Sequence, residues 1–309
     1  MKINISKRTV KILFAFSCLY FIWGSTYMAI KFAIDSMPPF LMASSRFLAA
    51  GLILFGISRV KSDEKIEYKH WKSAFITGGL LLLGGNGGVV YAELYLPSGI
   101  TALLISAVPI WFVILNWLLP KGEKPTVRTI IGVLVGFSGM YYLIQPFNGE
   151  TQDINLIGVG SLMLATFLWA LGSVYSGKID IPRSKLTAAG MQMIGGGVLL
   201  LLFSLVTGDF FKFDPAAVTT KSLVSLVYLF IFGSMVAYTA YIWLLDTVGS
   251  ALTATYAYVN PVIAVFLGWI FAGEELNSRI ILATLIIIAS VAIISNPFRK
   301  STKIIKDQN

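Results

Sequence analysis

Ten long apolar runs follow one another along the chain, and they constrain its fold more than any other feature. A bilayer is crossed by about 20 apolar residues in a helix, and each run has close to that length. Backbone groups in lipid must be satisfied within the segment, and a β-barrel would show short alternating strands instead. The sequence therefore predicts an all-α polytopic membrane protein with ten transmembrane helices. The predicted spans are 12–34, 39–58, 74–92, 100–119, 129–144, 154–176, 186–206, 223–245, 251–272 and 280–295.

The composition excludes several other classes. Hydrophobic residues make up 56% of the 309 residues and charged residues only 13%, against roughly 25% charged in soluble domains. One cysteine, Cys18, and one histidine, His70, cannot build a disulfide framework or a histidine–thiolate metal site. A phosphate-binding GxxxxGK[ST] motif is also missing from the sequence. We therefore expect no enzyme, no catalytic residue, no metal, no cofactor and no ATP.

Lysine and arginine are distributed unequally between alternate connections. Nineteen of the 24 lie on one side of the ten-span topology, three lie on the other side, and Lys31 and Arg46 fall within spans. Because cytoplasmic loops hold an excess of Lys and Arg, both termini are expected in the cytoplasm and the protein in the cell (inner) membrane. The net charge of +9 then reflects topology, and nucleic acid is not an expected partner.

The second half of the sequence repeats the first. An offset of 146 residues places Trp23 on Trp169, and an offset of 152 places Pro109 on Pro261 and Glu123 on Glu275. Five spans per copy is an odd number, so the second copy enters the membrane from the opposite side. We expect two inverted five-helix repeats, residues 1–149 and 150–309. Inverted repeats are common in secondary transporters, where the two halves exchange conformations; a symmetric channel or scaffold is the alternative.

Three segments resemble a known family. They read FIWGSTYMAIKF at 21–32, RFLAAG at 46–51 and YVNPVIAVFLGWIFAGEEL at 258–276. Together with the paired halves, they resemble the EamA family of the drug/metabolite transporter superfamily, in its bacterial inner-membrane form. The resemblance implies ten helices around a central cavity, a small metabolite or drug as cargo, and export as the usual direction.

Aromatic and amide side chains within the predicted spans are the candidates for a substrate cavity. Asparagine and tyrosine at membrane depth need polar partners, which a water-filled cavity supplies; the alternative is that they hold helices together. The set comes from the helices that line the cavity in the family that the chain resembles. Its members are Trp23, Asn86, Tyr91, Trp111, Trp169, Tyr238, Tyr241, Tyr256 and Asn260.

Three charged residues are candidates for the transport pathway. Arg46 lies within the second span, where a charge is costly, so it is expected to face protein as a counter-ion for a substrate carboxylate or as an anchor to helix-end carbonyls. Glu93 and Asp246 end the third and eighth spans on opposite faces, where they carry protons, attract amines or are simply hydrated. Protons are thus a candidate coupling ion.

Prolines and glycines indicate where helices bend and pack. Pro109 and Pro261 each remove a backbone hydrogen bond, which predicts kinks in the fourth and ninth spans. The glycine cluster at 84–88 predicts close packing or a bendable third span, and Gly132 and Gly136 predict packing within the chain.

These features together predict a secondary transporter, with the lipid bilayer as its surroundings. The expected cargo is a small neutral or zwitterionic metabolite, such as an amino acid, or a drug, carried by alternating access. Phosphorylated or nucleotide sugars are the alternative cargo, although such anions require more buried cations than Arg46 and Lys31. A passive channel or a scaffold without transport activity is the alternative from another class.

Overall fold

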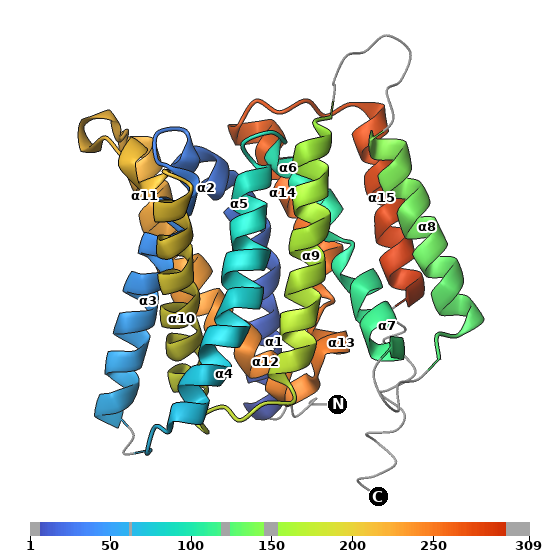
Figure 1. The fold of residues 1–309 in the computed structure, drawn as a ribbon. Helices are drawn as coiled ribbons and strands as arrows, with labels where there is room; N and C mark the ends of the chain where they lie inside the picture. Colours follow the sequence, from blue (N-terminus) through green and yellow to red (C-terminus); the bar gives the residue numbers. More distant parts are fainter. Residues whose placement is uncertain (1–6, 62–63, 119–123, 145–153, 295–309) are drawn as a thin grey trace, which may run out of the picture.

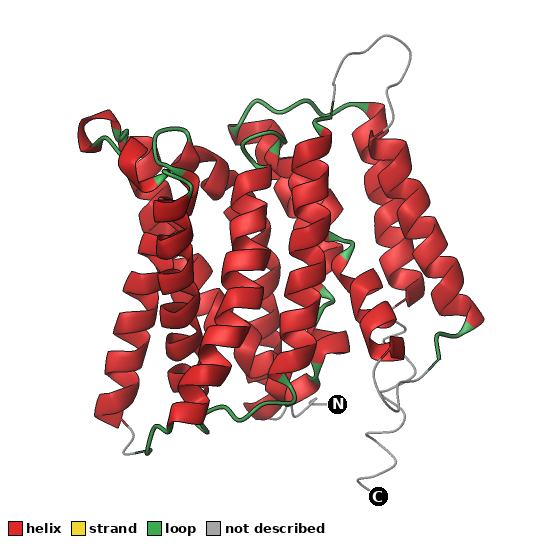
Figure 2. Cartoon of the chain, in the orientation of Figure 1, coloured by secondary structure: helices red, strands yellow, loops and turns green. Residues whose placement is uncertain are grey.

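The computed structural model describes residues 7–61, 64–118, 124–144 and 154–294, and every regular element within these ranges is helical (Figures 1 and 2). The first half contains α1 (Lys7–Ser17), η1 (Cys18–Trp23), α2 (Gly24–Ile34), α3 (Pro39–Lys61), α4 (Tyr68–Gly78), η2 (Gly79–Gly87), α5 (Gly88–Ala92), α6 (Ser98–Ile105), α7 (Val108–Leu118) and α8 (Val127–Ile144). The second half contains α9 (Leu156–Ser176), α10 (Lys185–Val206), η3 (Phe210–Lys212), η4 (Pro215–Ala217), α11 (Thr220–Tyr228), η5 (Leu229–Tyr238), α12 (Thr239–Val248), α13 (Ser250–Thr253), α14 (Tyr256–Phe271) and α15 (Ser278–Ile294).

Several consecutive elements join into continuous membrane-length helices. Eight helical segments within the described residues are long and apolar enough to cross a bilayer, and two shorter apolar helices, Val259–Ala272 and Ser278–Ile294, follow them. Large apolar side chains such as Leu134 on α8 and Leu285 on α15 remain exposed, as expected of surfaces that contact lipid. The protein is therefore an all-helical, multi-pass membrane protein. The ends of the predicted spans differ from those of these helices by at most six residues, except that the predicted span 251–272 starts eight residues before Val259–Ala272.

Three of the long helices contain a π-helical stretch in the middle. These stretches are η1 in the first span, η2 in the third and η5 in the eighth. The third and eighth spans correspond under the 152-residue offset, so η2 and η5 occupy equivalent places in the two halves. π-Helical turns are rare and widen the helix, and they occur often at functional sites.

The fourth and ninth spans are each broken. Ser106 and Ala107 separate α6 from α7, directly before Pro109, whereas the break between α13 and α14 lies several residues before Pro261. Pro261 lacks the N–H that would donate to the Ala257 carbonyl oxygen. The Ser106 hydroxyl donates to that oxygen instead, at 3.1 Å. Ser106, in the break of the fourth span, thus satisfies the Ala257 carbonyl oxygen, which Pro261 leaves without a donor in the ninth span.

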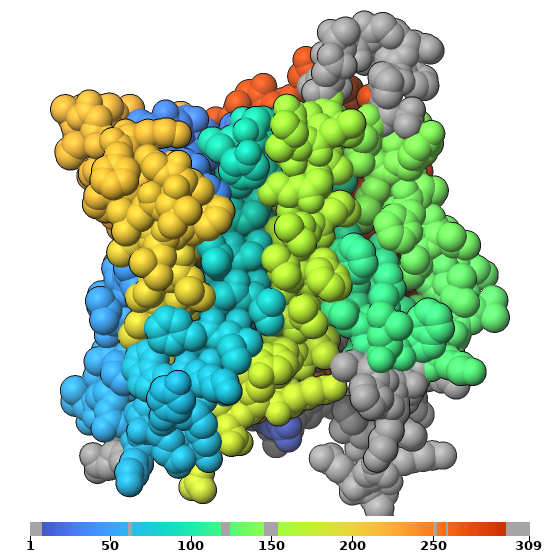
Figure 3. Space-filling model, in the orientation of Figure 1, coloured from blue at the N-terminus to red at the C-terminus, as the bar shows by residue number. Residues whose placement is uncertain are grey.

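Helices α3 and α10, which correspond under the 146-residue offset, pack closely along their length. A Cβ atom built on Gly51 would lie 2.8 Å from the Ile194 backbone nitrogen, and one built on Gly190 would lie 2.8 Å from the Phe55 nitrogen. Only glycine permits this backbone-to-backbone approach. In the space-filling view α10, the α4–α5 span and α9 lie side by side in contact (Figure 3).

An acid from the loop after each of these two helices accepts backbone hydrogen bonds at the start of the other. Asp209, which follows α10, accepts hydrogen bonds from the Phe40 and Leu41 N–H groups at the start of α3, at 2.9 and 3.3 Å. Glu64, which follows α3, accepts from the Arg183 and Ser184 N–H groups at the start of α10, at 2.7 and 3.2 Å. The end of each helix therefore lies beside the start of the other, and the two run antiparallel.

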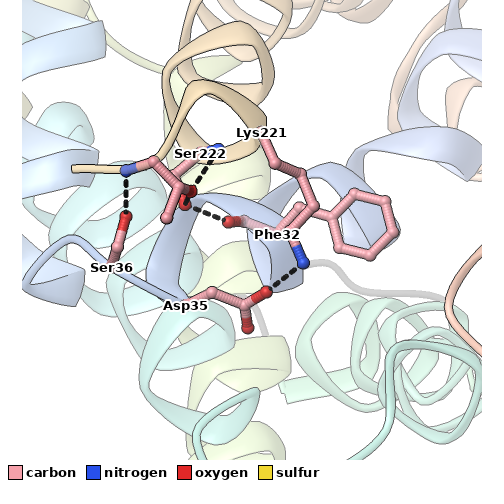
Figure 4. Close-up of polar contacts among 6 residues, drawn as sticks. Phe32, Asp35, Ser36, Lys221 and Ser222 are labelled. Carbon is pink, nitrogen blue, oxygen red and sulfur yellow. Dashed lines mark hydrogen bonds and ion pairs between the residues drawn. The ribbon is translucent and has the colours of Figure 1, made fainter. Parts of the chain in front are cut away.

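Polar contacts also join the end of α2 to the start of α11 (Figure 4). The Ser222 hydroxyl donates to the Phe32 carbonyl oxygen at 2.7 Å, and Lys221 forms an ion pair with Asp35. The Thr219 N–H donates to the Ser36 hydroxyl at 3.1 Å. These contacts connect the first half to the second at the face of the bundle that also holds the α5–α6 and α10–α11 connections (Figures 1 and 4).

Candidate functional site

A cavity lies in the middle of the bundle, between residues of both halves. Its volume is about 70 Å³, counted as the space that the centre of a water molecule can occupy. First-half side chains from η1, α2, α3, η2, α5, α6 and α7 line it, and α9, η5 and α14 contribute from the second half. The lining residues are Trp23, Thr26, Tyr27, Ile30, Arg46, Phe47, Leu82, Gly85, Asn86, Val89, Ile105, Val108, Ala165, Thr166, Trp169, Gly233, Tyr238 and Tyr256.

Three aromatic rings form one wall, and a fourth ring lies behind them. The Trp23 ring centroid lies 5.6 Å from that of Trp169 and 5.3 Å from that of Tyr256, both in edge-to-face geometry. Tyr241 lies behind them, 5.0 Å from Trp23, and its hydroxyl shares a hydrogen bond with Ser173. These separations suit aromatic pairs, and the open ring faces can hold an apolar body or a cationic group.

The π-helical stretches contribute to the same site. The Trp23 Nε1 donates to the Gly233 carbonyl oxygen of η5 at 3.2 Å. Gly84 and Gly85 of η2 pack against α9, since a Cβ on Gly85 would lie 2.8 Å from the Trp169 ring. The predicted close packing of this glycine cluster is thus present, and it places η2 directly behind the aromatic wall.

The cavity lining also carries a buried cation. Arg46 is 3% exposed, and its Nη2 donates to the Asn86 side-chain oxygen of η2. Its Nε has no hydrogen-bond partner among the described residues, and the guanidinium lies 4.4 Å from the Phe47 ring centroid. Among the described residues that line the cavity, Arg46 is the sole Lys or Arg and none is Asp or Glu. The site therefore has a positive charge without a carboxylate of its own.

The structure brings together five members of the predicted aromatic and amide set: Trp23, Asn86, Trp169, Tyr238 and Tyr256 all line the cavity. The other four lie elsewhere. Tyr241 supports the aromatic wall from behind, and Trp111 donates from Nε1 to the Thr166 hydroxyl at 3.0 Å, which joins α7 to α9. Tyr91 stacks on Phe40 nearer the end of its span.

Asn260 is 1% exposed and faces η1 rather than the cavity. With its amide oriented to suit its neighbours, the nitrogen lies 3.0 Å from the Tyr20 carbonyl oxygen and 3.1 Å from that of Tyr256. Asn260 therefore acts as a link between α14 and the π-helical stretch of the first span.

The two acids predicted for the pathway have opposite surroundings. Glu93 is fully buried, and neither carboxylate oxygen has a hydrogen-bond partner among the described residues. The Lys31 Nζ donates to the Glu93 backbone carbonyl oxygen at 2.7 Å. Asp246 is exposed and forms an ion pair with Lys185 at 2.8 Å.

Glu274 was not singled out by the sequence, although its neighbour Glu275 was. Its carboxylate accepts from the Ser98 N–H and hydroxyl, both at 2.6 Å, and from the Gly99 N–H at 2.9 Å. It thereby caps the start of α6 from the loop after α14. The repeat match that pairs Glu275 with Glu123 gives no signal for Glu274, which falls on Gly122 at the same offset.

Within the described ranges, no three His, Cys, Asp or Glu side chains gather as a metal ion would require.

Arg279 donates to the Tyr142 carbonyl oxygen at 3.1 Å and is not among the residues that line the cavity.

Comparison with known proteins gives the family. The profile of the EamA-like transporter family matches residues 10–145 and 156–296. An uncharacterised inner membrane transporter of Escherichia coli, YedA, is 34% identical over 282 residues, which is 91% of this chain and 89% of YedA. The uncharacterised transporter YoaV of Bacillus subtilis is 26% identical, over 91% of this chain and 96% of YoaV.

A solved crystal structure with 18% identical residues superposes with a TM-score of 0.66, over 93% of this chain and 98% of that one, and shows the same fold. The family profile covers both halves of the sequence. The chain belongs to the EamA-like transporter family and is a membrane transporter of that type.

Proposed function

We propose that the chain is a secondary transporter that exports a small neutral or zwitterionic metabolite, such as an amino acid, or a drug. Transport proceeds by alternating access of two inverted five-helix halves, residues 1–149 and 150–309, which together cross the membrane ten times. Both termini face the cytoplasm. The observation that carries the proposal is the central cavity, which needs side chains from both halves.

Two features support the inverted arrangement. The corresponding helices α3 and α10 run antiparallel, as a two-fold axis in the membrane plane requires. In addition, α1 begins and α15 ends toward the same side of the bundle, which is the lower side of Figure 1. An even number of crossings has this consequence.

The charge of the cavity supports a cargo with one carboxylate. A buried guanidinium that lacks an acidic neighbour in the cavity favours an anionic group beside it. The aromatic wall of the same cavity suits the remaining apolar or ammonium part of a zwitterion. A sugar phosphate or nucleotide sugar would bring several negative charges to this single cation, so we favour the monocarboxylate zwitterion.

Counterflow in proteoliposomes tests the function. The purified protein is reconstituted with a panel of unlabelled amino acids and related metabolites inside, and uptake of each labelled solute is measured. We expect saturable counterflow for at least one zwitterion. Flux that rises linearly with concentration would indicate a channel, and no flux for the whole panel would contradict the transport proposal.

Arg46→Met tests the carboxylate site. Loss of a charge-assisted hydrogen bond of about 1.5–3 kcal/mol should raise the half-saturation concentration roughly 10- to 150-fold. Arg128→Met is the matched control, because Arg128 is exposed, donates to the Ile293 carbonyl oxygen and is not part of the cavity lining. For an amide analogue of the cargo, the half-saturation concentration should differ little between Arg46→Met and the parent protein.

A further inference from the structure

Glu93 is the one acid among the described residues whose carboxylate is fully buried with both oxygens lacking a partner. It directly follows α5, at the face that the proposed topology places outside the cell. A charged carboxylate in such a place would lose its hydration without gaining a hydrogen bond, whereas the neutral acid would lose far less. The conformation seen here is thus compatible with the protonated form.

Charged and titratable groups from three neighbouring segments act on Glu93. Lys31 of α2 is the strongest favourable influence on its negative charge, and Arg46 of α3 adds a weaker one. Glu274, in the loop after α14, opposes that charge, and the Tyr27 hydroxyl of α2 lies within electrostatic range. Lys31 is held by the backbone carbonyl oxygen of Glu93, and Glu274 by the start of α6. Neither forms a hydrogen bond with the Glu93 carboxyl group.

Lys31 belongs to α2 and Glu93 directly follows α5, and both helices line the cavity. Ile30 of α2 and Val89 of α5 line the cavity one residue before Lys31 and four residues before Glu93. Separation of α2, α5 and α6 at the outer end of the bundle would admit water to Glu93 and to the cavity together. Hydration beside Lys31 would then favour the ionised carboxylate.

We propose that Glu93 is a proton-binding site that couples external pH to the opening of the outer end. Glu93 binds a proton when α2, α5 and α6 close around it, and releases the proton to external water when they separate. By linkage, external acidification favours the closed conformation and external alkalinisation favours the open one. The inference rests on the proposed alternating-access function and orientation.

Accessibility of Ile30 from outside reports the opening. The reporter is Ile30→Cys in a Cys18→Ala background, labelled in whole cells with a membrane-impermeant maleimide. Ile30 is 2% exposed here and faces the cavity, so its labelling requires the outer end to open. Phe211→Cys, in the exposed loop after α10, corrects for the pH dependence of the thiol reaction itself.

The ratio of the two labelling rates should rise at least about tenfold between about pH 5.5 and pH 8.5, since one coupled proton changes an equilibrium by up to tenfold per pH unit. Glu93→Gln should hold the ratio low at every pH. Lys31→Met, which removes the favourable cation, should move the midpoint to higher pH and tests the inference even if Glu93→Gln fails to fold. Asp246→Asn should leave the response unchanged.

The outcomes separate this inference from the transport proposal. A ratio that does not change with pH in a protein that performs counterflow would overturn the role of Glu93 alone. The role of Glu93 would also be overturned if the labelling ratio still responded to pH in Glu93→Gln and responded with an unchanged midpoint in Lys31→Met. That result would assign the proton to another group. A pH response that follows Glu93, without counterflow of any solute in the panel, would support Glu93 and refute the proposed cargo.

Discussion

The third and eighth helical spans correspond in the two halves, and each has a π-helical middle, yet they differ in packing and at their ends. The third span carries glycines throughout η2 and ends at the buried Glu93. The eighth has one glycine in η5, Gly233, and carries the exposed, ion-paired Asp246 near its end. The two corresponding helices thus share a π-helical middle, whereas only the third span is rich in glycine there and ends at a buried acid.

The largest effect that would test this difference is expected from reversing the charge at the buried acid. Glu93→Lys places a second cation beside Lys31 in a fully buried site, and an uncompensated buried charge costs roughly 3 to 5 kcal/mol. We expect loss of monodisperse protein in detergent or a large fall in Tm. Asp246→Lys should be well tolerated because its site is hydrated. Equal losses of stability in Glu93→Lys and Asp246→Lys would contradict the difference between a buried and a hydrated site.

Glycine packing is the next test. A Cβ on Gly88 would lie 2.7 Å from the Ala165 Cβ, whereas the nearest atom to a Cβ on Gly233 would be the Thr26 Cγ2 at 3.1 Å. We expect Gly88→Ala to destabilise the protein by about 1–3 kcal/mol through overpacking. Gly233→Ala should change stability by less than about 1 kcal/mol. Thermal unfolding of the two variants in the same detergent measures the difference, and a larger loss at Gly233 would contradict it.

Glu64 provides an acid with the opposite pH behaviour to Glu93. Although partial burial raises its pKa, the backbone N–H groups of Arg183 and Ser184 outweigh this and lower the pKa overall. Its contribution to stability is therefore fully present above the usual glutamate pKa of 4.5 and is lost as the pH falls through the lowered value. Glu64→Gln should cost about 1 kcal/mol at neutral pH, because a charged acceptor of the Arg183 and Ser184 N–H groups is replaced by a neutral one. Stability measured against pH should show a smaller acid-induced loss in this variant than in the parent.

The smallest effect is expected at the exposed end of the eighth span. The Asp246 and Lys185 side chains are 51% and 23% exposed, and an ion pair of this kind contributes about 0–1 kcal/mol. Asp246→Asn should shift Tm only slightly, and added salt should abolish the shift. A loss of stability above about 1 kcal/mol that does not depend on salt would show that Asp246 has a structural role like that of a buried acid.

The sequence predicted the helices well because the length and polarity of each run are local properties. The span at 186–206, for example, differs from α10 by one residue at its start. Intramolecular packing of Gly132 and Gly136 was also predicted, and Ser290 of α15 donates to the Gly132 carbonyl oxygen. The cavity was partly predictable, since five of nine proposed side chains line it.

The remaining features depend on contacts between segments distant in the sequence. The hydrated state considered for Glu93 is not what the structure shows, because residues from α2 and the loop after α14 surround it. Arg46 was expected to bind a substrate carboxylate or helix-end carbonyls, and the contact observed is with the Asn86 amide. The three π-helical stretches have no sequence signal that separates them from ordinary helix.

The hydrogen bonds from the start of α3 to Asp209, in the loop after α10, have a consequence for how the protein is synthesised. The N–H groups of Phe40 and Leu41 receive their acceptor from Asp209, a residue synthesised 169 positions after the first of them. The start of α3 in a nascent first half therefore lacks this protein acceptor, and its N–H groups must bond to water until Asp209 is synthesised. The final packing of α3 is expected to be completed only after α10 has entered the membrane.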